Sequence, residues 1–363
     1  VSIKYLSAYY CYVEQDVAKL VKILGSTGLI MIILEAALDL VVSRSKLKMI
    51  GNSLMSAIVA FAISAFGIAY LLSNWLGQPF HLAFLYAVPM SIISSAIVIP
   101  SSSHLPEQKK EFIVYESSFS DIIGILVFNY MLMENLTSFK SFFIFAGNIG
   151  VAIAISVIAS LILIYMLTTI TVNLKFFLIF AILALVYSVG ELARIPSLLI
   201  ILVFGLLLNN SSLLFRGRFK RLSTPEFMSG ITNLMRSITA ETSFLIRTFF
   251  FILFGYTIQV DLMVNPEVIL LGSLIVGILF LVRFLYLRFV LRANLFPELF
   301  LMPRGLVTIL LFYSIPADKT MNNFNVGVLF FVVVSTSLIM MLGLIFCKTP
   351  AIDNYVEVPE EIT

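Results

Sequence analysis

Two carboxylates in one apolar stretch are the residues of this chain best suited to chemistry. Glu116 and Asp121 both lie in segment 115–121, near the start of an apolar run that continues to about Met133. A carboxylate inside a lipid bilayer is costly and therefore usually marks an ion or proton pathway. If the helix begins near Glu111, Asp121 lies roughly 15 Å deep, near the middle of a hydrocarbon core about 30 Å thick.

Small polar residues accompany Asp121 on the predicted helix. Ser117 and Ser118 precede it by four and three residues, so both share its face, and Ser120 is its neighbour in the chain. Gly124 follows on the same face and leaves room for a close backbone approach. Hard cations prefer oxygen ligands, so this stripe suits a small cation or a proton. The alternative is a polar contact between helices, which the cost of an aspartate at the bilayer centre disfavours.

The composition identifies a polytopic membrane protein. Of 363 residues, 60% are hydrophobic and only 12% are charged, and the mean hydropathy is +1.07. The two cysteines, Cys11 and Cys347, and the two histidines, His81 and His104, exclude a Cys/His metal cluster and a disulfide framework. A Walker-type phosphate loop and a basic patch for nucleic acid are both absent from the sequence. We expect no cofactor beyond the transported ions.

The hydropathy pattern predicts an all-α protein with about eleven membrane-spanning helices. Their ranges are roughly 17–43, 49–75, 79–100, 111–133, 140–168, 174–190, 194–209, 239–258, 267–292, 297–315 and 322–347. Segment 210–238 is predicted to be an amphipathic cytoplasmic connection, because basic and apolar residues alternate in it. Segment 348–363 is a short acidic tail.

The basic residues of the connecting loops predict the orientation in the membrane. Most of them gather on one side, which is therefore expected to be cytoplasmic together with the C-terminus. That side carries Arg44, Lys46, Lys48, Lys109, Lys110, Lys175, Arg216, Arg218, Lys220, Arg221, Arg288, Arg292 and Lys348, and the other side carries Lys140, Arg194 and Lys319. Lys4, Lys19 and Lys22 depart from this rule. The sequence thus predicts a multi-pass protein of the cytoplasmic (inner) membrane.

Two predicted spans are expected to be interrupted. The third contains Ser94 and Ser95, whose hydroxyls can satisfy an unwound backbone at membrane depth, and it ends at Pro100. The tenth contains Pro303, Arg304 and Gly305, a combination that favours a break. Interrupted spans at corresponding positions of two halves indicate a transporter site between them. Harmless proline kinks are the alternative.

Charged residues in other spans must find partners. Glu35 lies in the first span, and Arg247, Arg283 and Arg304 lie at similar depths, roughly 10–13 Å from the same side of the membrane by helix rise. Ion pairs between acid and arginine are therefore allowed, but depth alone leaves the choice of partners open.

At these positions the chain resembles the monovalent cation:proton antiporters of the sodium/proton exchanger type. Segment 34–39 is similar to the family's Phe-Glu-x-Gly-Leu-x-Leu-Asp, segment 116–121 to Glu-Ser-Leu-Leu-Asn-Asp, and segment 303–307 to Leu-Arg-Gly-Ala-Val. Segment 94–98 lies where that family unwinds a helix, and segment 251–255 fits a weaker family pattern. The motifs extend over nearly the whole chain in the family's order.

The resemblance implies an inverted-repeat fold with two crossed, interrupted helices, a scaffold domain and a mobile core, and we expect a homodimer. Asp121 would bind the cation or a proton in competition, with oxygens from Ser94, Ser95, Ser117 and Ser120. The resemblance also implies two structural ion pairs, between Glu116 and Arg283 and between Glu35 and Arg304.

Two departures from the family pattern bear on the transported ion. Ser120 replaces the usual Asn before the aspartate, which leaves one titrating acid and favours electroneutral exchange. The Thr-Asp-Pro of many sodium exchangers is absent around Ser94 and Ser95, where the pattern is closer to that of the potassium-efflux relatives. We therefore predict exchange of Na⁺ or K⁺ for H⁺ by alternating access. The alternative is a cation channel or a proton-gated cation efflux pathway; an enzyme is disfavoured because no catalytic pair stands out.

The repeat logic also predicts the domain organisation. Residues 1–209 would hold the first repeat, a linker helix and the start of the second repeat, and residues 239–347 the remainder of the second. The first repeat would lack two helices before residue 17, so a complete protein is expected to have about thirteen spans, and the sixth and seventh spans would lack symmetry mates.

Overall fold

The computed structural model describes residues 27–28, 30–40, 46–102, 105–132, 139–169, 175–192, 197–210, 225–257, 260–291, 296–321 and 323–346. Over these residues the secondary structure is helical, as predicted. The predictions for the N-terminal segment, the basic residues 216–221, the tail 348–363, the two cysteines and His104 lie outside the described residues.

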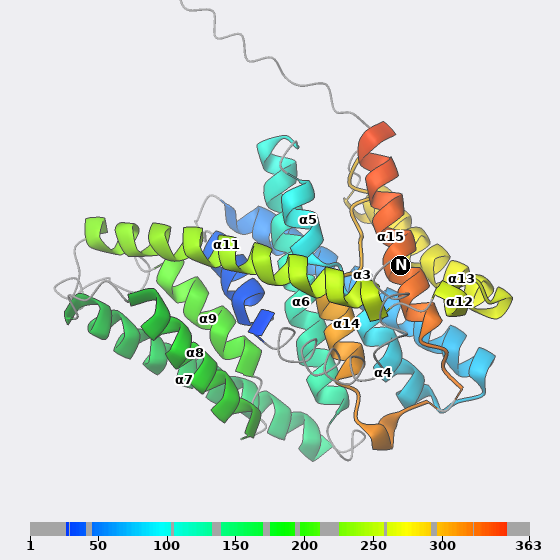
Figure 1. Ribbon diagram of the computed structural model, residues 1–363, viewed down its shortest axis with the longest axis horizontal. Helices are drawn as coiled ribbons and strands as arrows, with labels where there is room; N and C mark the ends of the chain where they lie inside the picture. Colours follow the sequence, from blue (N-terminus) through cyan, green and yellow to red (C-terminus); the bar gives the residue numbers. More distant parts are fainter. Residues whose placement is uncertain are drawn as a thin grey trace, which may run out of the picture.

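Seven helices form one packed group around the two interruptions (Figure 1). Its first half contains α3 (Leu47–Leu76), α4 (Phe80–Ser91), α5 (Ser95–Ser101) and α6 (Glu107–Met131). Its second half contains α13 (Pro266–Leu285), extended by a π-helical turn (Tyr286–Leu291), α14 (Leu306–Tyr313) and α15 (Gly327–Phe346). The short α12 (Val260–Met263) packs against α13 and α15, and a 3-10 turn occupies Ala317–Lys319.

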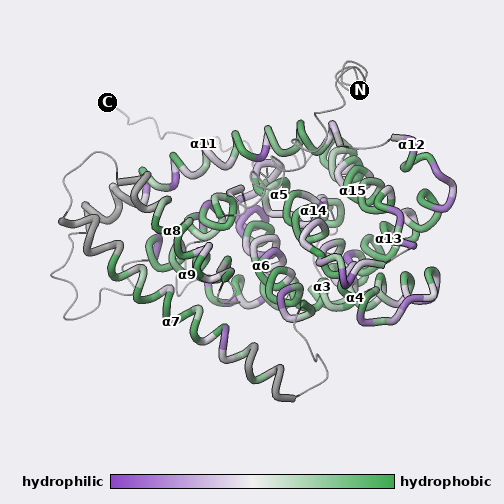
Figure 2. The backbone as a smooth tube through the Cα atoms, turned by 60° about the horizontal axis from the view of Figure 1, so that its bottom comes forward, coloured by the Kyte–Doolittle hydropathy of each residue, from purple (hydrophilic) through white to green (hydrophobic). Residues whose placement is uncertain are grey.

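A second group consists of α7 (Phe139–Thr169), α8 (Lys175–Leu192) and α9 (Ser197–Asn209), which lie side by side at the left of Figure 1. The helical segment 30–39 packs against α9, where Gly205 has no side chain and lies against Ala37 and Leu34. The long α11 (Pro225–Thr257) crosses both groups, as both Figure 1 and Figure 2 show.

Five helices of the described residues are long and apolar enough to cross a membrane, and the tube in Figure 2 shows their predominantly apolar character. They are Leu47–Leu76, Phe80–Ser101, Thr232–Tyr256, Pro266–Leu291 and Gly327–Phe346. Helix α6 has 25 residues, but the polar segment 107–121 dilutes its apolar character. The chain is therefore a multi-pass membrane protein, and the number of eleven spans stays a prediction.

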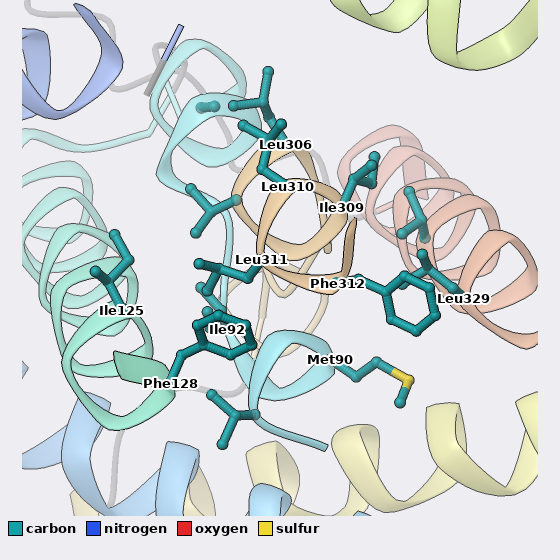
Figure 3. Packing of buried hydrophobic residues seen from close by; sticks show 14 of the residues in the cluster. Met90, Ile92, Ile125, Phe128, Leu306, Ile309, Leu310, Leu311, Phe312 and Leu329 are labelled. Atoms are coloured by element: carbon teal, nitrogen blue, oxygen red, sulfur yellow. The ribbon is translucent and has the colours of Figure 1, made fainter. Parts of the chain in front are cut away.

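Both predicted interruptions are present, and they touch each other. Residues 92–94 separate α4 from α5, and residues 301–305 precede α14 without helical structure. The N–H of Ser94 donates to the carbonyl of Pro303 over 3.0 Å, so the two non-helical segments cross at this point. Helix α14 is buried between α4, α6 and α15, whose apolar side chains surround it in Figure 3.

Three predicted boundaries differ from the structure. The tenth span is helical only in its second half, because residues 296–300 form turns and residues 301–305 have no regular secondary structure. Helix α11 begins at Pro225, inside the stretch assigned to the connection, and buries Thr232, Met235 and Thr239 along one face. Helix α6 begins at Glu107 rather than near Glu111, directly after Pro106, whose missing N–H costs no hydrogen bond at a helix start.

Candidate ion-binding site

Helix α6 buries the polar face that the sequence predicts. Glu116, Ser117, Ser118 and Ser120 are each 1% exposed, and Asp121 is 5% exposed. The helix packs against α3, α4 and α5, so these side chains point into the group that contains the two interruptions. The polar residues of the stripe are therefore shielded from lipid by neighbouring helices.

The first interruption supplies hydrogen-bond donors to α6. Oδ2 of Asp121 accepts from the N–H of Ser95 at 3.3 Å and from the Ser95 hydroxyl. The hydroxyl oxygen of Ser120 accepts from the N–H of Ile93 at 2.9 Å. These N–H groups are free to bind α6 because the backbone between α4 and α5 is not helical. The break thus holds Asp121 in place through backbone as well as side chain.

The second interruption packs closely against the first at Gly305. A Cβ atom at Gly305 would lie 2.5 Å from Oγ of Ser94 and 2.8 Å from Cδ1 of Ile97, so only glycine allows this approach. The neighbouring Arg304 is 2% exposed, and its N–H donates to Oγ1 of Thr336 on α15 over 3.1 Å. The predicted break around Arg304 therefore lets the two interrupted segments pack closely against each other.

Four buried oxygen atoms near the crossing have no hydrogen-bond partner among the described residues. They are Oδ1 of Asp121 and the hydroxyls of Ser94, Ser118 and Thr308. Ser94 touches the Gly305 position, Ser118 lies one turn before Asp121, and Thr308 lies in the first turn of α14. Unsatisfied polar atoms are rare in protein interiors, so these oxygens are the best placed to bind an ion.

The other predicted ligands have hydrogen-bond partners within the protein. Ser117 donates to the Val114 carbonyl at 3.3 Å, Ser120 accepts from Ile93, and Ser95 donates to Asp121. The sequence did not single out Thr308, although its position three residues after Gly305 places it in the first turn of the helix that follows the break.

Glu116 forms the ion pair that we expected with Arg283. Oε1 of Glu116 accepts from Nη1 of Arg283 on α13 and from the hydroxyl of Ser56 on α3. Nε of Arg283 donates to the Glu298 carbonyl over 3.3 Å, and the Glu298 carboxylate pairs with Lys109 at 2.7 Å. This network joins α3, α6 and α13 around a fully compensated carboxylate.

The expected pair between Glu35 and Arg304 is wrong. Glu35 pairs instead with Arg247 of α11, at 3.2 Å between Oε1 and Nη2, because α11 also lies against Gly28 and pairs with Asp39. Arg304 remains inside the crossing, where it interacts electrostatically with Asp121 and with Arg283. Its Nε and Nη1 have no acceptor within the described part of the chain.

A small cavity of about 10 Å³ adjoins these groups, enough for roughly one water molecule. Its polar lining comes from Ser64, Ser91, Ser120, Arg283 and Arg304. The crossing is therefore tightly packed but not completely filled.

The family model described as "Sodium/hydrogen exchanger, transmembrane" matches residues 8–346 of this chain. The chain belongs to the sodium/hydrogen exchanger family. Two solved structures of the sodium proton antiporter MjNhaP1 from Methanocaldococcus jannaschii are similar to this exchanger in fold.

The first of these, determined at pH 8, has a TM-score of 0.68 and 18% sequence identity, with 92% of this chain and 86% of that chain covered. The second, an electron-microscopy map, has a TM-score of 0.62 and 17% identity, with 89% and 81% covered. No curated protein sequence matches the exchanger. Membership of the family supports cation:proton antiport, and the structural likeness confirms the antiporter fold.

Proposed function

We propose that this exchanger moves Na⁺ or K⁺ in one direction and H⁺ in the other through a single site at Asp121. The observation that carries the proposal is the buried carboxylate at the crossing of the two interrupted segments, with Oδ2 held by Ser95 and Oδ1 left open. An ionised carboxylate binds a hard cation and a protonated one does not, so cation and proton compete for the same oxygens.

The open oxygens around Asp121 suggest the ligand set. Hydroxyls of Ser94, Ser118 and Thr308 complement the carboxylate, because their lone pairs are not used by other described groups. Neutral oxygens and one carboxylate suit a monovalent cation, for which a cluster of acids is not needed. Whether Na⁺ or K⁺ fits better depends on the separation of these oxygens in the loaded protein.

The balance of charge supports electroneutral exchange. Glu116 is compensated by Arg283, which leaves Asp121 as the acid of the crossing that is free to exchange ligands. A single carboxylate carries either one cation or one proton, so each cycle would move one charge each way. Arg304 interacts electrostatically with Asp121 and would offset its charge in the interval between the two ligands.

The two groups of helices suggest how access alternates. The group around the crossing would move as a core against the group of α7, α8 and α9, with α11 spanning both (Figure 1). We place the protein in the cytoplasmic membrane with the C-terminus in the cytoplasm, on the distribution of basic loop residues. The homodimer that we propose rests on the family resemblance.

Ion flux in sealed proteoliposomes tests the proposal. Vesicles with an imposed pH gradient should exchange protons when Na⁺ or K⁺ is added, at a rate that an imposed membrane potential leaves unchanged. Cation flux that proceeds without proton movement would identify a channel instead, and a rate that follows the potential would contradict electroneutrality.

A further inference from the structure

Pro100 leaves a carbonyl of α5 without its usual donor. In an α-helix the carbonyl of residue 96 accepts from the N–H of residue 100, but proline has no N–H. Helix α5 has only seven residues and includes Pro100, so the loss falls on its first turn. The Ala96 carbonyl is therefore available to a donor from another element.

Arg247 of α11 supplies that donor. Its Nη1 donates to the Ala96 carbonyl over 3.0 Å, and its Nη2 donates to Oε1 of Glu35 over 3.2 Å. The Arg247 side chain is 12% exposed and the Glu35 side chain 14% exposed, so both interactions are largely shielded from solvent. One guanidinium thus joins α11, segment 30–39 and the interrupted span, a geometry that its rigid fork of donors allows.

The position of α5 determines the hydrogen bonds of Asp121. Ser95, the first residue of α5, provides both the N–H and the hydroxyl that bind Oδ2 of Asp121. A seven-residue helix is too short to be stable without tertiary contacts, so its placement depends on what holds it. Arg247 binds the residue directly after Ser95.

We infer that Arg247 is a positioning residue for the ion site: it replaces the donor that Pro100 removes, and so sets the distance of Ser95 from Asp121. The inference rests on the proposed exchange at Asp121 and adds a residue from outside the crossing to it. Arg247 does not touch the ion; it acts through the first turn of α5.

Helix α11 also provides a matched control. Arg236 lies on the same face, pairs with Asp39 at 3.2 Å, and donates to the Leu38 carbonyl at 2.6 Å. Arg236 thus makes the same two kinds of contact as Arg247, and it also donates to Oδ1 of Asn209 at 3.1 Å, but its carbonyl acceptor belongs to segment 30–40 rather than to α5. Removing Arg236 tests the loss of an ion pair on α11 without the loss of the α5 contact.

The experiment measures exchange in proteoliposomes against cation concentration for Arg247→Met, Arg247→Lys and Arg236→Met. Arg247→Met should raise the KM for the cation about tenfold, as for the loss of one hydrogen bond from a charged donor, with the maximal rate per folded protein nearly unchanged. Arg247→Lys should raise the KM less, because the ammonium keeps the positive charge and can still donate to the Ala96 carbonyl, although it lacks the rigid fork of the guanidinium. Arg236→Met should keep the wild-type KM. An unchanged KM in both Arg247 variants, or an equal rise in Arg236→Met, would overturn the inference.

Pro100→Ala provides a second test, which asks whether the defect of the Arg247 variants can be rescued and so does not rely on any single variant folding correctly. Alanine restores the N–H for the Ala96 carbonyl, so Pro100→Ala combined with Arg247→Met or Arg247→Lys should bring the KM back toward the wild-type value. Failure of this rescue in both combinations would mean that Arg247 acts through Glu35 rather than through α5, contrary to the inference. If the wild-type protein shows no exchange, the proposed function fails; if it exchanges and the Arg247 variants match it, only this inference fails.

Discussion

Glu116 and Asp121 lie on the same helix and are both buried, yet their surroundings differ in kind. Oε1 of Glu116 accepts from Arg283 and Ser56, so the charge is compensated within the protein. Asp121 accepts only through Oδ2, from Ser95, and its Oδ1 has no partner among the residues described. The comparison shows how one helix can hold a structural carboxylate and an exchangeable one: a compensated charge stabilises the packing, whereas an incompletely satisfied one can bind a ligand.

The largest expected effect comes from removing the charge at the exchangeable position. Asp121→Asn keeps the size of the side chain but neither binds a cation as a carboxylate nor titrates. We expect exchange in proteoliposomes to be abolished while the protein still inserts, because insertion follows hydropathy rather than one acid. Robust exchange by this variant would remove Asp121 from the site.

The same change at the compensated position should affect stability instead. Glu116→Gln leaves Arg283 buried without its counter-charge, which costs about 3–5 kcal/mol. Thermal unfolding in detergent should show a lower Tm for Glu116→Gln than for Asp121→Asn. A stable Glu116→Gln protein with an altered cation affinity would reverse the roles of the two acids.

The competition between proton and cation predicts a dependence on pH. While the carboxyl of Asp121 is protonated, each bound cation must displace one proton, so the apparent cation affinity should rise with pH by up to about tenfold per unit. The rise should end once the carboxyl is ionised. Exchange rates measured against cation concentration at several pH values check this, and an affinity that does not vary with pH would contradict a shared site.

A smaller effect should separate two neighbouring serines. Ser118→Ala removes an open hydroxyl and should weaken cation binding about three- to tenfold, the range for one neutral oxygen. Ser117→Ala is the control, because the Ser117 hydroxyl already donates to the Val114 carbonyl and should leave the affinity unchanged. If Ser117→Ala raised the half-saturating cation concentration more than Ser118→Ala did, Ser117 rather than Ser118 would be the ligand.

The smallest effect should come from an ion pair near the N-terminus of α6. Lys46 pairs with Glu111, but about a third of the Lys46 side chain is exposed to solvent. Exposed pairs contribute at most about 1 kcal/mol, so Lys46→Ala should shift the Tm far less than Glu116→Gln does. A comparable loss of stability would show that burial is not what distinguishes the Glu116 pair.

The sequence predicted the features that depend on local pattern. The cost of a carboxylate in an apolar run identified Asp121, and the serines before Pro100 identified the break between α4 and α5. The contact between Glu116 and Arg283 followed from a family resemblance, and the structure contains it. These features depend on residue type and spacing, which are visible in the chain itself.

Features that depend on the rotation and approach of distant helices were not predictable in the same way. Depth along a helix allowed Glu35 to pair with Arg304, but α11 presents Arg247 to Glu35 instead. The open hydroxyl of Thr308 also depends on how α14 packs within the crossing. Sequence spacing gives the face of a helix, and only the packing shows what that face meets.

Proton release on cation binding tests the central claim most directly. Purified protein in weakly buffered detergent solution is titrated with NaCl and with KCl while the pH is followed, at a pH where the exchangeable carboxyl is protonated. The wild-type protein should release about one proton per bound cation for at least one of the two salts. Asp121→Asn should release none. Equal proton release by both proteins, or cation binding by the wild type without proton release, would contradict a single carboxylate shared by cation and proton.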